Sequence, residues 1–247
     1  NDVTYSVASI GESAFKICSE LTSIKIPNNI TSIGDDAFYG CTGLKEIYVF
    51  SEEPATIKSK TFSYHSATLY VPVGARSAYA NASYWADFTN ITEYVDKDLV
   101  FEVTSEGKAT VSVTAYPGNQ PIVAIPSHYT IDGKTYTVTS LGRYTFDGCT
   151  SLTSIVIPNS VTSIGSYTFR DCSALTSVHI SDLAAWCNIS MDGPIFNNLY
   201  NLYIGGELAS NIVIPDKITK IKPYTFFACE SIVNLTIPNS VTTVGNS

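Results

Sequence analysis

A repeated pattern constrains the fold of this chain more than any other feature of its sequence. Residues 152–172 read LTSIVIPNSVTSIGSYTFRDC, or L-x-x-I-x-I-P-x-x-V-x-x-I-G-x-x-[AT]-F-x-x-C in general form. The Gly, Phe and Cys of this pattern also occur 23 residues earlier, and two copies near the N-terminus are again 23 residues apart. A fixed period of this length is typical of a solenoid, in which each repeat forms one coil.

A single repeat of this kind is not stable alone. Burial of about six large apolar side chains contributes roughly 10 to 15 kcal/mol, whereas fixing each backbone residue costs on the order of 1 to 2 kcal/mol. Stacked repeats bury the same faces against each other, so stability becomes a sum of interactions between neighbours.

Each position of the repeat then has a predicted role. In a half-buried strand, Ile155 and Ile157 point inward while Ser154 and Val156 point outward. Pro158 ends the strand because it lacks a backbone donor. The remaining roles are a second apolar run at Val161 and Ile164, a turn at Gly165, an interior ring at Phe169 and a small buried residue at Cys172.

Five blocks of the form I/L-[GK]-x-x-[AT]-F-x-x-C occur in the chain, and three are followed by an L/I-x-x-I/L-x-I-P strand. This repeat resembles the BspA-type (treponemal-type) leucine-rich repeat of bacterial cell-surface proteins, over nearly the whole chain. The resemblance implies a curved, right-handed leucine-rich-repeat solenoid with a parallel β-sheet and short helical turns. It also implies an extracellular or cell-surface protein for adhesion or recognition, but it indicates no ligand.

We expect a first array of repeats over residues 1–95. Its register survives to about residue 72 through a degenerate repeat in which His65 takes the cysteine position. The segment 74–94 then changes period, because Tyr79, Tyr84, Trp85 and Phe88 are spaced roughly as on one face of a helix. In the family that the chain resembles, an aromatic-rich helix closes an array, so we expect such a cap here.

We expect a second array over residues 96–247, beginning with β-hairpins. Alternating stretches on either side of residues 105–108 predict one hairpin. Asp132-Gly133 predicts another, because both positions of such a turn need positive φ. Repeat strands are predicted at 123–126 and 199–204, regular repeats at 141–180, and a turn at Gly205-Gly206. The stretch 181–198 breaks the spacing and maps to a loop on one side of the solenoid, often a binding side.

Both ends of the sequence fall within a repeat, at residues 7–11 and 241–245. We therefore expect targeting information to lie outside this sequence and the partial coil from Val241 to fray. Whether the two arrays form one arc or bend at residues 96–98 stays open.

Charge and hydropathy exclude two classes of partner. The formal net charge is −8, and only 14 Lys and Arg residues are scattered along the chain, so we expect no nucleic acid. No stretch approaches about 18 consecutive apolar residues, so we expect no membrane insertion by this segment. We also expect a monomer.

The cysteines do not predict a metal or cofactor site. Five of them share one repeat position and Cys187 stands apart. Neighbouring coils about 4.8 Å apart would permit disulfides, but parallel side chains do not face each other, so we favour buried free thiols. The sequence has no C-x-x-C, H-E-x-x-H, G-x-S-x-G, phosphate-binding loop or EF-hand pattern. We therefore expect no metal, no cofactor and no enzymatic activity.

The outward strand positions form the candidate partner-binding surface. Most are small or polar, and the exceptions are three tyrosines and one histidine. Rigid amphipathic rings on an exposed sheet suit protein or glycan recognition. The alternative is that each ring covers a neighbouring loop. The candidate residues are Tyr48, Tyr70, His179, Tyr203, Lys25 and Val156.

Three hypotheses for the function follow. The first, favoured by the resemblance, is a recognition or adhesion module for a protein or glycoprotein, such as host extracellular matrix or another cell surface. The second is a structural spacer that displays other domains, and the third is a carbohydrate-binding appendage. A uniformly small, polar sheet face would favour the spacer, and three tyrosines on one flat strip would favour the carbohydrate-binding appendage.

Overall fold

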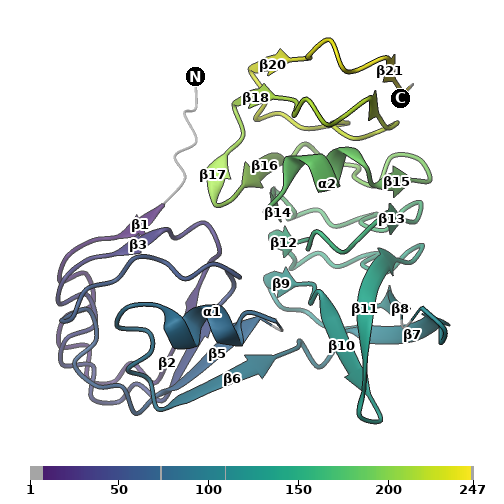
Figure 1. The fold of residues 1–247 in the computed structure, drawn as a ribbon. Helices are drawn as coiled ribbons and strands as arrows, with labels where there is room; N and C mark the ends of the chain where they lie inside the picture. The colour runs from purple at the N-terminus through teal and green to yellow at the C-terminus, as the bar shows by residue number, and fades with distance from the viewer. Residues whose placement is uncertain (1–7, 73, 109, 246–247) are drawn as a thin grey trace. The chain divides into compact units, whose positions relative to one another are not determined.

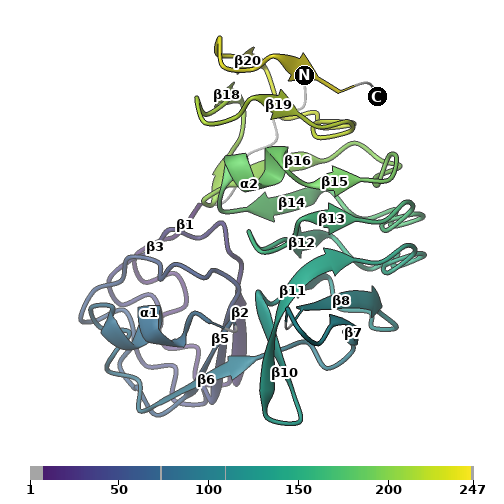
Figure 2. The same ribbon diagram turned by 45° about the vertical axis from the view of Figure 1, so that its right-hand side comes forward.

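Short, mostly parallel strands stack into coils in the computed structural model, which describes residues 8–72, 74–108 and 110–245. The chain divides after Tyr94 into two compact units, called the first and the second unit below. Within each unit, successive coils of the chain lie side by side (Figure 1 and Figure 2). The solenoid predicted from the repeat is confirmed.

The first unit is built around one parallel sheet in the order β2–β4–β5–β6, with a second short sheet of β1 and β3. Across the larger sheet, Ile24, Ile47, Leu69 and Ile91 stand opposite one another and face the core. The elements are β1 (Ser9–Ile10), β2 (Ser23–Ile26), β3 (Ser32–Ile33), β4 (Glu46–Val49), β5 (Thr68–Pro72), α1 (Arg76–Asn81) and β6 (Asn90–Tyr94).

The phenylalanine of the repeat fills the interior of the inner coils, as predicted, but Phe15 in the first unit is 39% exposed. In the first unit the ring centroids of Phe15 and Phe38 lie 5.3 Å apart, and those of Phe38 and Phe62 lie 5.0 Å apart. The rings are nearly parallel, so each covers a face of the next and excludes water from it.

The helix predicted over residues 74–94 is mostly wrong. Helix α1 ends at Asn81, and Tyr84 has a left-handed φ of 66° that no helix tolerates. The chain then turns Trp85 and Phe88 inward against the ring of Phe62, and the indole of Trp85 donates a 2.7 Å hydrogen bond to the carbonyl of Ala55. Strand β6 follows and pairs with β5, so an extra strand replaces much of the expected helix.

The second unit contains two larger sheets, because most coils contribute one strand to each. Their orders are β17–β16–β14–β12–β9 and β15–β13–β11–β8–β7, with β10 beside β11. The last coils pair separately, β18 with β20 and β19 with β21. The elements are β7 (Val100–Ser105), β8 (Thr110–Ala115), β9 (Ile122–Ala124), β10 (His128–Ile131), β11 (Lys134–Leu141), β12 (Ser154–Val156), β13 (Ser163–Ile164), β14 (Ser177–Ile180), α2 (Leu183–Cys187), β15 (Ser190–Met191), β16 (Asn201–Ile204), β17 (Glu207–Leu208), β18 (Asn211–Val213), β19 (Lys220–Ile221), β20 (Asn234–Thr236) and β21 (Thr243–Val244).

Both predicted hairpins of the second unit are present. Strands β10 and β11 are antiparallel, with φ of 50° at Asp132 and 78° at Gly133, as a two-residue turn requires. Strands β7 and β8 form the other hairpin, and its turn residue Glu106 accepts a 2.7 Å hydrogen bond from Lys134 and a 2.8 Å hydrogen bond from Tyr136. The two hairpins are therefore tied together by this carboxylate.

The irregular stretch 181–198 contains helix α2, whose first backbone amides donate to the Asp182 carboxylate. Inside the coil, Trp186 is 1% exposed and donates a 2.9 Å hydrogen bond to the carbonyl of Thr225. Gly205 and Gly206 then turn the chain back, at φ of 58° and 89°, so that β17 runs antiparallel to β16. This turn separates the last coils from the main sheet.

Two backbone positions in most coils are left-handed, one two residues before the interior phenylalanine and one two residues after it. The first kind includes large side chains, and the second is often glycine. The left-handed residues before the phenylalanine are Ser13, Asp36, Tyr144, Tyr167 and Tyr224, and those after the phenylalanine are Ile17, Gly40, Gly148, Asp171 and Ala228.

The threonine and cysteine positions of the repeat link neighbouring coils through hydrogen bonds. The hydroxyl of buried Thr168 donates towards the carbonyls of Gly165 at 2.6 Å and Gly142 at 2.9 Å. The thiol of Cys172 donates to the carbonyl of Phe146 at 2.9 Å, and Cys41 makes the same contact with Phe15 at 3.1 Å. The carbonyls of Phe146 and Phe15 also accept from the backbone amides of Cys149 and Cys18, so each thiol adds a second hydrogen bond that links its coil to the preceding one.

All six cysteines are free thiols, as predicted, but burial was predicted too broadly, since Cys18 is exposed. Only Cys41, Cys172 and Cys187 are buried. We expect titration with a thiol reagent to find six thiols in denaturant, and these three to react slowly in the native protein because the reagent cannot reach them. Fewer than six thiols in protein that is denatured without a reducing agent would contradict the assignment.

Candidate functional site

The candidate residues of the first unit form one row across its larger sheet. Lys25 stands opposite Tyr48, and Tyr48 opposite Tyr70, on strands β2, β4 and β5. The rings of Tyr48 and Tyr70 stack with centroids 4.4 Å apart at an interplanar angle of 8°, and Tyr94 meets Tyr48 edge-on at 5.7 Å. Lys25 is exposed and the two stacked tyrosines are half-buried, so part of each ring faces solvent.

The surroundings of Tyr48 keep its phenol neutral. Burial, and then the nearby Glu46 and Tyr70, raise the pKa of the Tyr48 hydroxyl. The Tyr48 hydroxyl therefore stays a neutral hydrogen-bonding group at physiological pH.

The candidate residues of the second unit form a similar row, but they are not exposed as expected. Val156 stands opposite His179, and His179 opposite Tyr203. The side chains of His179 and Tyr203 are only 3% and 6% exposed. Their rings stack with centroids 4.5 Å apart at 14°, so each covers a face of the other, and Val156 is half-buried beside them. The prediction of a solvated aromatic surface is therefore wrong for His179 and Tyr203.

The buried imidazole of His179 makes the stability of the fold pH-dependent. Burial lowers the pKa of His179 from 6.5 to about 4, and its Nδ1 atom has no hydrogen-bond partner among the described residues. Because the native state resists protonation below the unfolded-state pKa, stability falls as the pH drops from about 6.5 and levels off below about 4.

We expect this histidine to account for a loss on the order of 3 kcal/mol in the free energy of unfolding between neutral pH and pH 4. The variant His179→Phe keeps an aromatic ring against Tyr203 but cannot titrate. Urea unfolding of both proteins at several pH values measures the difference. Equal pH dependence in the two proteins would show that His179 is not the responsible group.

Sequence reasoning missed a second group of exposed aromatic residues, on the turns of the second unit. Tyr144 and Tyr167 are 37% and 42% exposed, and Arg143 and Arg170 lie over their rings. The signal available in the sequence is the recurrence of Tyr-Thr-Phe at 144–146, 167–169 and 224–226. It places a tyrosine at the left-handed turn position each time.

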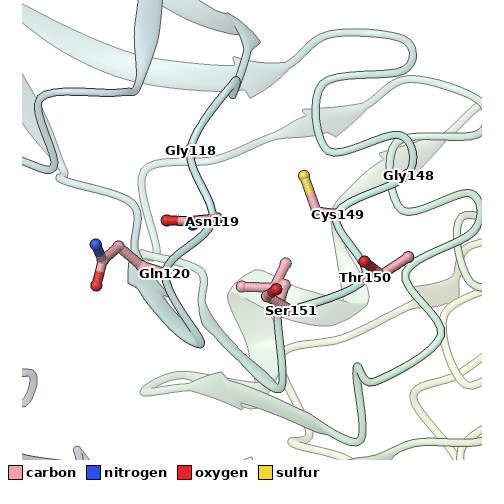
Figure 3. Close-up of a pocket in the computed structure, with 8 residues that line it drawn as sticks. Gly118, Asn119, Gln120, Gly148, Cys149, Thr150 and Ser151 are labelled. Carbon is pink, nitrogen blue, oxygen red and sulfur yellow. The ribbon is translucent and has the colours of Figure 1, made fainter.

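A small hollow in the second unit is not a ligand site of ordinary size. It has a volume of about 90 Å³ and lies between residues 118–120 and 148–152, with the side chains of Asn119, Cys149 and Ser151 around it (Figure 3). Pockets for organic ligands usually measure roughly 300 to 1,000 Å³. This hollow has room for a few water molecules.

The described part of the chain offers no group of three or more His, Cys, Asp or Glu side chains placed to hold a metal ion. Between residues 8 and 245, apart from the undescribed positions 73 and 109, no helix has the length and apolar character needed to span a bilayer.

Solved structures of bacterial leucine-rich repeat proteins resemble this fold at low sequence identity. A leucine-rich repeat protein of T. pallidum is 18% identical with a TM-score of 0.35, covering 62% of this chain and 86% of that one. A leucine-rich cell surface protein from Faecalibacterium prausnitzii A2-165 is 20% identical with a TM-score of 0.31, covering 95% and 85%. A leucine-rich repeat protein from Bacteroides ovatus ATCC 8483 is 18% identical with a TM-score of 0.29, covering 99% and 69%.

Comparison of the sequence with curated proteins finds no match. The family model described as a BspA type leucine rich repeat region matches in six copies, over residues 2–97, 131–207 and 200–247. These ranges cover well over half of the sequence and include the repeats whose stacking is described above. The chain therefore belongs to the BspA-type leucine-rich repeat family.

Proposed function

We propose that this chain is a non-enzymatic recognition module that binds a protein or glycoprotein partner outside the cell or at its surface. The observation that carries the proposal is the stacked pair Tyr48 and Tyr70, half exposed on a sheet face beside Lys25. The family supports it in general terms, because its members are bacterial surface proteins that generally act as interaction modules.

The physical advantage of this pair is that its rings are already ordered. Binding of a partner costs little conformational entropy of the tyrosine side chains, because stacking and the strand backbone already hold them in place. Tyrosine also combines a large apolar face with a hydroxyl, and it is enriched where interfaces gain most of their binding energy. Lys25 adds a positive charge at the end of the row.

Binding of the purified chain to immobilised extracellular-matrix proteins, plasma glycoproteins and glycans tests the proposal. The variant Tyr48→Thr with Tyr70→Thr removes both rings, and threonine already stands in the same row of the sheet at Thr92. The control is Tyr64→Thr, which removes a tyrosine that is 54% exposed and lies outside the strands. We expect binding to a matrix or cell-surface protein that the double variant loses and the control keeps.

Two outcomes of this experiment would overturn the proposal. Binding to glycans alone, lost in the double variant, would favour a carbohydrate-binding appendage. If neither the parent chain nor its variants bind any member of the panel, a structural spacer is favoured. The outward positions of the last coils support that alternative. There Asn211 and Asn234 bond to each other at 2.7 Å, which uses polar side chains to link coils instead of presenting them to a partner.

A further inference from the structure

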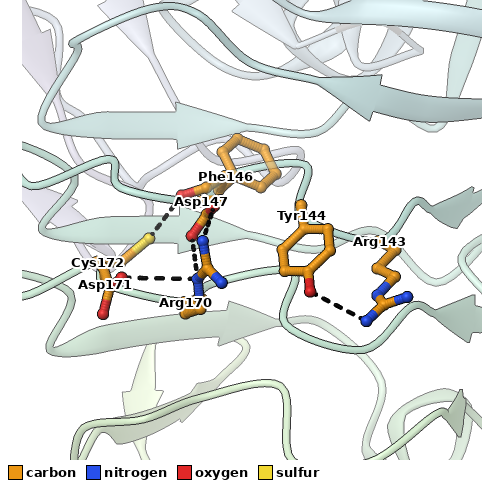
Figure 4. Close-up of polar contacts among 7 residues, drawn as sticks. All are labelled: Arg143, Tyr144, Phe146, Asp147, Arg170, Asp171 and Cys172. Carbon is orange, nitrogen blue, oxygen red and sulfur yellow. Dashed lines mark hydrogen bonds and ion pairs between the residues drawn. The ribbon is translucent and has the colours of Figure 1, made fainter.

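The strongest unassigned feature is a cluster of exposed side chains on the turns of the second unit, called here the tyrosine–arginine cluster: Arg143, Tyr144, Tyr167 and Arg170. The rings of Tyr144 and Tyr167 stack with centroids 5.5 Å apart at 8°. The guanidinium of Arg143 lies 4.7 Å from the centroid of Tyr144 and 5.4 Å from that of Tyr167. It also donates a 3.0 Å hydrogen bond to the hydroxyl of Tyr144 (Figure 4).

The two arginines of the cluster differ in charge balance. Arg170 donates two hydrogen bonds to the carboxylate of Asp147 and lies 3.6 Å from Asp171, so its charge is compensated. Arg143 has no Asp or Glu oxygen within 4.0 Å in the described part of the chain. Cation–π contacts and the hydrogen bond to the Tyr144 hydroxyl hold its guanidinium in place, and none of the described carboxylates bonds its N–H groups.

The backbone does not call for tyrosine at these positions. Tyr144 and Tyr167 have φ of 62° and 58°, a left-handed conformation that disfavours bulky side chains and that Asn or Asp adopts more easily. In the first unit the equivalent positions are Ser13 and Asp36. The tyrosines are also too exposed to contribute much to the core. Their side chains are thus better explained by what they present to solvent than by the turn that carries them.

We propose that the tyrosine–arginine cluster docks a segment of a protein partner that places one Asp or Glu carboxylate on Arg143 and an apolar side chain against the tyrosine rings. Tyrosine and arginine are, with tryptophan, the residues enriched at the energetic centres of protein interfaces, and the planar guanidinium pairs well with a carboxylate. Asp147 and Asp171 both lie at Arg170, so Arg143 is the arginine of the cluster without a carboxylate. The four charged groups sum to zero, which suits a single carboxylate on Arg143 and not a polyanion.

This inference rests on the proposed function in requiring a protein partner, but it uses none of the residues Lys25, Tyr48 and Tyr70. The two can therefore fail separately. A variant of the sheet row that loses matrix binding should still dock the segment described here, and a variant of the cluster should still show the matrix contacts of the sheet row.

A random dodecapeptide library displayed on phage, selected on the full chain, provides the probe. The selected peptides are then tested against the variant Arg143→Gln, which keeps hydrogen-bonding capacity but removes the charge. This test separates peptides that need Arg143 from those that do not. We expect the peptides lost with this variant to share an Asp or Glu next to an apolar or aromatic residue. The best such peptide is then synthesised with its Asn or Gln counterpart, and its Kd is measured by fluorescence anisotropy.

We expect Arg143→Gln to raise the Kd of the peptide about tenfold or more. The double variant Tyr144→Asn with Tyr167→Asn should raise it by a similar factor. The peptide in which Asn or Gln replaces the acidic residue should bind the parent chain more weakly by a similar factor. The matched control is Tyr84→Asn, since Tyr84 is also left-handed at φ of 66° and 41% exposed, and none of the described ring contacts involves it. Its Kd should not change.

Thermal unfolding separates docking from a structural role, because asparagine suits all three left-handed positions. The double variant should unfold at the same temperature as Tyr84→Asn or higher. A clearly lower unfolding temperature, with no change in peptide Kd, would mean that the cluster only stabilises the turns. Peptides that bind independently of Arg143, or a glycan that binds through the cluster when no peptide does, would overturn the proposal.

Discussion

Phe169→Ala is expected to lower the free energy of unfolding of the second unit by about 3–5 kcal/mol. The side chain is 2% exposed, and its ring lies between those of Phe146 and Phe196, with centroids 5.3 and 5.1 Å away. Backbone hydrogen bonds from Phe146 to Thr168 and from Phe169 to Ile195 hold the neighbouring coils at a fixed spacing. The coils cannot close on the space left by the ring, so a cavity remains.

The two tryptophans make this loss measurable within one unit. Trp85 lies in the first unit and Trp186 in the second, and both are 1% exposed. In a Trp85→Phe background, the fluorescence of Trp186 during urea denaturation reports the second unit alone. The control is Ser154→Ala on the outward side of β12, which should change the free energy by less than about 0.5 kcal/mol. Equal losses for both variants would show that the inward and outward positions are assigned wrongly.

The coils and hairpins could be predicted because their causes lie in short stretches of sequence. Alternation fixes which residues of Leu152–Cys172 face the core, and Asp132-Gly133 fixes a turn through its own backbone preferences. The segment after Gly74 could not be predicted in the same way. Its aromatic spacing fits a helix, but Trp85 and Phe88 reach the core from a turn, because the ring of Phe62 needs covering there.

The candidate surfaces show a similar limit. The repeat register correctly brings Tyr48 beside Tyr70 and His179 beside Tyr203, since equivalent positions in neighbouring coils must be adjacent. Exposure is not part of the register, and the burial of His179 depends on packing that no spacing reveals. The recurrence of Tyr-Thr-Phe 23 residues apart already places Tyr144 beside Tyr167, but the sequence gives no sign that this turn position is left-handed and exposed, so the stacked pair was missed.

Gly165→Ala is expected to destabilise the second unit by about 3 kcal/mol, although it adds only one methyl group. The sequence suggested a turn as the reason for glycine, but Gly165 is not among the left-handed residues of the described chain. The reason is the close approach of the preceding coil. A Cβ at this position would lie 2.6 Å from the backbone nitrogen of Arg143 and 2.9 Å from the carbonyl carbon of Gly142.

The same spacing recurs in the first unit, where a Cβ on Gly34 would lie 2.5 Å from the nitrogen of Glu12. Backbone atoms cannot swing aside as a side chain can, so the coil must move. Moving it strains the 2.9 Å hydrogen bond that the amide of Gly165 donates to Leu141. Gly165→Ala therefore acts on the packing between coils and not on the conformation of one residue.

Gly107→Ala is the matched control, because a Cβ there would have no atom within 4 Å and the residue is not left-handed. Its free energy of unfolding should stay within about 0.5 kcal/mol of the parent protein. Both variants are compared through Trp186 fluorescence in the Trp85→Phe background. If Gly165→Ala costs no more than Gly107→Ala, the coils are farther apart than the structure places them. If it costs the expected amount, the glycine of the repeat marks where neighbouring coils touch, and the sequence alone then locates those contacts.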